Sequence, residues 1–188
     1  MKYLMMKYAL PVAALALLVS CSTDTTAEGP VADPFFSLED FFNSEVQRLS
    51  ELQPKVVKTL DIGGNTESHT DLVLDFSTEL GAFVNSDINK PSWSDKYRVD
   101  SVFSDAGHLG ELHYLAKDSS MYTRDIRLTF DPEGALQTCF VRNRLTNFIS
   151  DFRQNLYYDR ETGYRISVYQ GFGEDAKAPV ELAVTFLK

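Results

Sequence analysis

The sequence predicts an α+β domain in which two N-terminal amphipathic helices pack on one curved antiparallel sheet of about six to seven strands. Apolar residues recur at helical spacing in the first half of the chain. In the second half they alternate with polar residues in short segments joined by turn sequences. With 44% hydrophobic residues, 13 Phe and 9 Tyr in 188 residues, the chain has enough apolar material for one core.

Residues 1–20 have the order of charged, apolar and small residues that is typical of a secretory signal peptide. Lys2 and Lys7 precede an apolar run over 9–19, and the small Ser20 follows it. A helix needs about twenty apolar residues to cross a bilayer, so this run predicts a cleaved export signal and not a membrane span.

The junction Leu18-Val19-Ser20-Cys21 resembles the lipobox of bacterial lipoproteins. The resemblance implies cleavage before Cys21 and acylation of Cys21, which would hold the mature chain in a membrane by several acyl chains. Ser22 is similar to the residue found at this position in outer-membrane lipoproteins. We therefore expect the protein to lie in the cell envelope, anchored to the outer membrane, and leave open which face of that membrane it occupies. Residues 21–34 form the predicted lipidated tether, and 35–188 a single globular domain.

The first helix is predicted over residues 38–52. Ser37 followed by Asp40 has the form of a helix N-terminus, and Pro54 disfavours continuation beyond Leu52. Its apolar residues fall at helical spacing, which predicts an amphipathic helix with the apolar face toward the core: Leu38, Phe41, Phe42, Val46, Leu49 and Leu52.

A short hairpin and a second helix are predicted next. Residues 55–62 and 66–70 flank the turn sequence Gly63-Gly64-Asn65 and are expected to pair. Asp71 is the predicted cap of a second amphipathic helix that reaches residue 84. The following segment, 87–93, resembles part of a lipoprotein group of unknown function, and that resemblance implies no activity.

The second half of the chain is predicted to consist of strands. Because short turns link them, we expect an antiparallel meander, with curling into a partial barrel left open. The predicted strands cover seven segments: 97–104, 111–117, 122–131, 135–145, 152–158, 164–172 and 180–187.

Charge and cysteine content exclude some functions. The net charge of −9 becomes −11 without Lys2 and Lys7. This negative charge argues against binding of nucleic acid and against long-range electrostatic attraction to anionic lipid head groups. With Cys21 lipidated, Cys139 has no disulfide partner, and its apolar surroundings predict a buried, inert thiol.

Candidate site residues are few, and no catalytic or cofactor motif occurs, so no cofactor is expected. Glu111 and His113 would share one strand face, but they lack further ligands and predict no metal site. Arg142 and Arg144 share a strand face with Phe140, a combination suited to carboxylate, phosphate or sugar ligands. The alternative is that these arginines only pair with acids on a solvated face.

Three functions stay open at this stage. The favoured hypothesis is a non-enzymatic lipoprotein, anchored to the membrane by its lipid, that binds a partner protein or an apolar or amphiphilic ligand. The second is a structural or assembly component of the envelope, which predicts an exposed apolar patch or an unpaired strand edge. The third is a hydrolase acting on envelope glycans or lipids, which predicts carboxylates, or Glu111 with His113, converging in one cleft.

Overall fold

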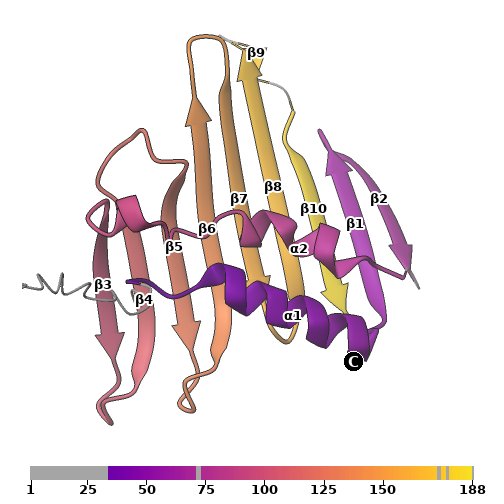
Figure 1. Ribbon diagram of the computed structural model, residues 1–188. Coiled ribbons are helices and arrows are strands. Elements are labelled where there is room, and N and C mark those ends of the chain that lie inside the picture. Colours follow the sequence, from indigo (N-terminus) through magenta and orange to yellow (C-terminus); the bar gives the residue numbers. More distant parts are fainter. Residues whose placement is uncertain (1–33, 71–72, 173–174, 177, 188) are drawn as a thin grey trace, which may run out of the picture. The chain divides into compact units, whose positions relative to one another are not determined.

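The computed structural model describes residues 34–70, 73–172, 175–176 and 178–187 (Figure 1). The predicted signal peptide, Cys21 and most of the predicted tether lie outside them. The predicted α+β class is confirmed, since two α-helices lie against a single antiparallel sheet.

Helix α1 spans Leu38–Leu52, as the sequence predicts. The Ser37 hydroxyl accepts a hydrogen bond from the Asp40 N–H at 3.0 Å, which caps the first turn. The prediction of a simple amphipathic helix was wrong in two places. Glu45 lies on the buried face of α1 and is 3% exposed, whereas Leu52 at the C-terminal end is 61% exposed.

Helix α2 spans Phe76–Val84 and begins later than predicted. Its cap is Asp75, because the Asp75 carboxylate accepts hydrogen bonds from the Ser77 N–H and the Thr78 hydroxyl. The predicted cap, Asp71, lies outside the described residues. Val73, which the sequence places on the apolar face of this helix, precedes it and is largely exposed.

The two helices do not both precede the sheet, because the predicted hairpin lies between them and joins it. Strand β1 (Val56–Ile62) pairs with β2 (Asn65–Thr70) on one side. On its other side β1 pairs with β10 (Val180–Phe186), the last strand of the chain. This pairing of the two ends of the domain raises the strand count above the predicted six to seven.

All seven predicted C-terminal strands are present. Those before β10 form the predicted antiparallel meander: β3 (Tyr97–Phe103), β4 (Leu109–Ala116), β5 (Thr123–Phe130), β6 (Leu136–Thr146), β7 (Asp151–Asp159) and β8 (Gly163–Phe172). Within the described residues the strand order is β2-β1-β10-β8-β7-β6-β5-β4-β3, and the two-residue β9 (Asp175–Ala176) pairs with β8. β2 and β3 are therefore the edges of an open sheet and do not close a barrel.

The core lies between the helices and one face of the sheet, which both helices cross in Figure 1. Phe42 of α1 stacks on Phe83 of α2 with ring centroids 4.5 Å apart. The same Phe42 ring meets Tyr158 of β7 edge-on at 5.2 Å. Three elements that are distant in sequence thus share one aromatic cluster, which fixes the helices on this face of the sheet.

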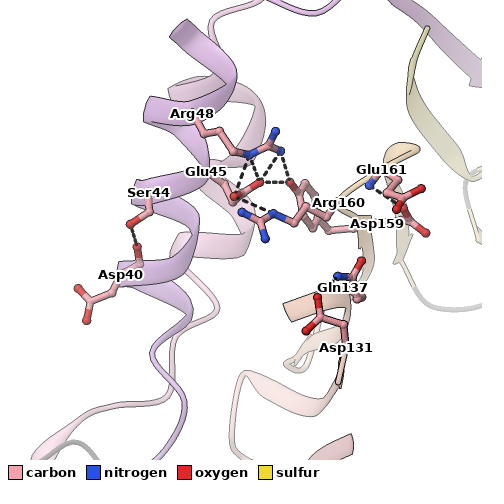
Figure 2. A network of polar contacts seen from close by, with 10 residues as sticks. Asp40, Ser44, Glu45, Arg48, Asp131, Gln137, Asp159, Arg160 and Glu161 are labelled. Carbon is pink, nitrogen blue, oxygen red and sulfur yellow. Dashed lines mark hydrogen bonds and ion pairs between the residues drawn. The ribbon is translucent and has the colours of Figure 1, made fainter. Parts of the chain in front are cut away.

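A carboxylate also fastens each helix to the sheet, and the one on α1 is buried. Glu45 of α1 accepts hydrogen bonds from the Tyr158 hydroxyl and from Arg48 at 2.6 Å, and Arg160 approaches it at 3.4 Å (Figure 2). Burial alone would raise the pKa of Glu45, but the hydrogen bonds from Arg48 and Tyr158 outweigh it and lower that pKa below its ordinary value.

Helix α2 repeats this arrangement. Glu79 accepts a hydrogen bond from the Tyr164 hydroxyl at 2.8 Å and forms an ion pair with Lys58 of β1. Burial and the Glu79 carboxylate both raise the pKa of Tyr164, so this phenol stays protonated and donates. Each helix therefore has one carboxylate that is bound by a sheet tyrosine and a cation.

Candidate functional site

The sheet face opposite the helices, called here the outer face, carries most of the arginines. On β6 the buried Cys139 and Val141 alternate with Phe140, Arg142 and Arg144, so these last three share the outer face, as the sequence predicts. Cys139 is fully buried, and burial raises the pKa of its thiol, in agreement with the predicted inert cysteine.

Asp125 of β5 is the centre of one charged cluster on this face. Its side chain is 1% exposed, and it lies 2.9 Å from His113 Nε2. Arg142 Nη2 donates to its Oδ2 at 3.0 Å, and Arg127 Nη2 does so at 3.2 Å. Phe140 lies under Arg127, whose guanidinium carbon is 6.0 Å from the ring centroid.

Asp151 at the start of β7 is the centre of a second cluster. Arg144 Nε donates to it at 2.9 Å and Arg153 Nη2 at 2.6 Å. Arg144 and Arg153 are register partners on β6 and β7, so the sheet places two guanidinium groups directly opposite each other. The hydrogen bonds from Arg144 and Arg153 lower the pKa of Asp151 well below its ordinary value.

Beside these clusters lies a pocket of about 880 Å³, called here the arginine pocket. Five basic side chains line it, together with the carboxylate of Asp118. Asn155, Tyr169 and Leu115 contribute amide, phenol and apolar surface. The basic side chains come from three strands and one loop: Lys117, Arg124, Arg142, Arg144 and Arg153.

A β-bulge supplies one of these cations. The register of β5 with β6 shifts between Thr123 and Asp125, so the side chains of the consecutive residues Arg124 and Asp125 both lie on the outer face. Arg124 Nη1 donates to the backbone oxygen of Asp118 at 3.0 Å. Its Nε is buried and has no hydrogen-bond partner among the described residues, which leaves one donor unsatisfied in the pocket wall.

The charges in and beside the pocket do not cancel. Asp125 and Asp151 pair with Arg142, Arg144 and Arg153, whose side chains nevertheless stay 45–59% exposed. With Asp118, three carboxylates stand against five basic groups, in a protein whose net charge is −9. The surplus guanidinium donors suit a planar anionic group such as a carboxylate or a phosphate.

Sequence reasoning found only part of this pocket. Arg142 and Arg144 line it, whereas Phe140 lies on the same face outside its lining. Lys117, Arg124 and Arg153 were missed. The alternation of β7 already places Arg153 opposite the buried Leu156 and Tyr158, but only the strand register sets it against Arg144.

The weak metal candidates do not come together with further ligands. His113 contacts Asp125, while Glu111 lies two residues before it on β4, with Thr129 and Val102 as register partners. In the part of the chain that the structure describes, no group of three or more His, Cys, Asp or Glu could hold a metal ion.

The chain matches no protein-family model, no curated protein and no solved structure. Among the helices of the described residues, none is long and apolar enough to cross a membrane.

Proposed function

We propose that this protein is a lipid-anchored envelope lipoprotein of the outer membrane whose arginine pocket binds a small anionic or amphiphilic ligand without chemical conversion. One observation carries the proposal. Five basic side chains gather around a pocket of about 880 Å³ on a chain of net charge −9, and the Arg124 Nε–H points to no acceptor among the described residues. The membrane attachment rests on the lipobox resemblance of Leu18-Val19-Ser20-Cys21.

Binding suits the pocket better than hydrolysis. The carboxylates beside it, Asp125 and Asp151, each accept hydrogen bonds from two arginines, so their oxygens are already engaged. A general acid for glycoside or ester hydrolysis needs a carboxyl whose pKa is raised, and the arginines act on Asp151 in the opposite direction.

The test measures the affinity of the purified protein for inorganic phosphate by titration calorimetry. Arg144→Gln with Arg153→Gln removes two opposed guanidinium groups, and we expect it to weaken phosphate binding at least about tenfold, since each charged hydrogen bond contributes about 1.5–3 kcal/mol. The matched control is Arg165→Gln. Arg165 is exposed on the outer face of β8, opposite Tyr157, and does not line the arginine pocket, so its loss should leave the affinity unchanged.

Equal phosphate affinity in the wild type and the double variant would contradict the proposal. Native mass spectrometry of the protein purified gently from envelope extract adds a second readout. A retained anionic small molecule that disappears in the double variant would support the proposal and identify the ligand class.

A second candidate function, assembly within the envelope, has one observation in its favour. Edge strand β3 exposes Val99, Val102 and Phe103, and an apolar strand edge can pair with another chain. Concentration-dependent association of the wild type that is lost in Val102→Lys would support this role.

A further inference from the structure

We propose that the β6–β7 tip, residues 145–150, inserts into a phospholipid bilayer while the arginine pocket beside it takes the lipid phosphates. The tip sequence Leu-Thr-Asn-Phe-Ile-Ser carries no charge. Phe148 is fully exposed, and Leu145 and Ile149 are more than half exposed. Two bulky apolar side chains at the end of a turn are unusual on a solvated surface, where large apolar groups normally cluster in the core.

The tip is an ordered turn. The Asn147 N–H donates to the Ser150 oxygen at 2.9 Å, and the Asn147 side chain accepts from the N–H groups of Ile149 and Ser150 at 3.0 and 2.9 Å. These bonds satisfy the N–H groups of Asn147, Ile149 and Ser150 within the turn, while the side chains of Phe148 and Ile149 stay exposed.

Cations adjoin the tip where head groups would lie. Arg144 and Arg153, on the strands that lead into and out of the tip, line the arginine pocket. An apolar end bordered by arginines and Tyr169 matches a bilayer surface, in which phosphates and interfacial aromatics lie just outside the hydrocarbon. The net charge of −9 acts against anionic lipids at long range, but contacts within about 8 Å at physiological salt are governed by local groups.

The entry of the chain into the domain fits this orientation. Phe35 packs edge-on against Tyr97 at 5.7 Å, and Tyr97 begins β3. Antiparallel pairing from β3 to β6 puts the start of β3 at the same end of the sheet as the end of β6. A fully extended chain of residues 22–34 spans at most about 45 Å, which is long enough to let this end of the domain reach a membrane that holds a lipid on Cys21.

The inference rests on the proposed function, because the pocket arginines are assigned to lipid phosphates. The test uses the full chain as cells export it, reconstituted in vesicles of phosphatidylglycerol and phosphatidylcholine with brominated phosphatidylcholine as quencher. We expect Phe148→Trp to add a blue-shifted emission that the bromines quench. Phe103→Trp is the control, since Phe103 is also an exposed phenylalanine but ends β3 at the opposite end of the sheet.

The native Trp93 contributes the same background to both variants, and the wild type measures it. Emission from Phe148→Trp that is quenched no more than that from Phe103→Trp would overturn the membrane contact, and a partner protein would become the better occupant of the tip. If phosphate still bound the pocket, the proposed function would survive that result. If the bromines still quench Phe148→Trp in a chain that also carries Arg144→Gln and Arg153→Gln, the arginine pocket does not contribute to the membrane contact.

Discussion

The two faces of the sheet hold charged side chains in different ways. On the helix-covered face, Glu45 and Glu79 are each closed in by a tyrosine hydroxyl and a cation, so donors and acceptors are matched in place. On the outer face, the carboxylates Asp125 and Asp151 are covered by their arginines, while the guanidinium groups stay about half exposed. Matched charges fix the architecture, and a surplus of exposed cations leaves capacity for a ligand.

The largest effect that tests this comparison is expected from Glu45→Ala. The change leaves the buried Tyr158 hydroxyl without its acceptor and removes the ion pairs of Arg48 and Arg160, so it should lower the unfolding free energy by about 2–3 kcal/mol. Urea denaturation measures the loss. Glu51→Ala, on the exposed side of the same helix, is the control and should stay within about 0.5 kcal/mol of the wild type.

Removing one hydroxyl at a time should have a smaller effect. Tyr158→Phe and Tyr164→Phe each delete the donor to a helix carboxylate, and each should lower the unfolding free energy by about 1–2 kcal/mol. Tyr157→Phe alters a partly exposed outer-face tyrosine and should change stability little. Equal effects of all three changes on stability would show that tyrosine hydroxyls contribute no more on the helix-covered face than on the outer face.

The covered face should also make stability depend on pH on the acid side. The pKa of Glu45 is lower in the folded protein than its ordinary value of 4.5, so the unfolded chain binds its proton first. The stabilisation by ionised Glu45 is therefore complete above that ordinary value and is lost as the pH falls through the folded pKa. Glu45→Gln should make the thermal midpoint depend less on pH below 4.5. An unchanged slope in this range would argue against a stabilising role of ionised Glu45.

The smallest effect on stability is expected on the outer face. Arg144→Gln should change the unfolding free energy by less than about 1 kcal/mol, because its ion pair with Asp151 is partly solvated. The same variant should weaken phosphate binding. A large loss of stability without a change in phosphate affinity would assign these arginines to the architecture, and the distinction between the two faces would fail.

Much of this fold could be predicted because its signals are local. Ser37 and Pro54 bound α1, and the alternation of Ile126 and Leu128 with polar neighbours marks β5. The start of α2 was misplaced because Asp71 and Asp75 are both good caps, and only the bonds from Ser77 and Thr78 select Asp75. The position of β1 beside β10 has no local signal at all, since the two strands are about 120 residues apart in sequence.

The sequence by itself determined the α+β class, the first helix, the meander and the shared face of Phe140, Arg142 and Arg144, because periodicity within one element decides which side chains face the same way. Only the tertiary structure decided that Arg153 opposes Arg144 and that the bulge adds Arg124 to the same pocket. It also decided that Glu45 is buried with its partners. Register, bulges and helix docking depend on contacts between distant segments, and these contacts turn an arginine-rich strand into a pocket.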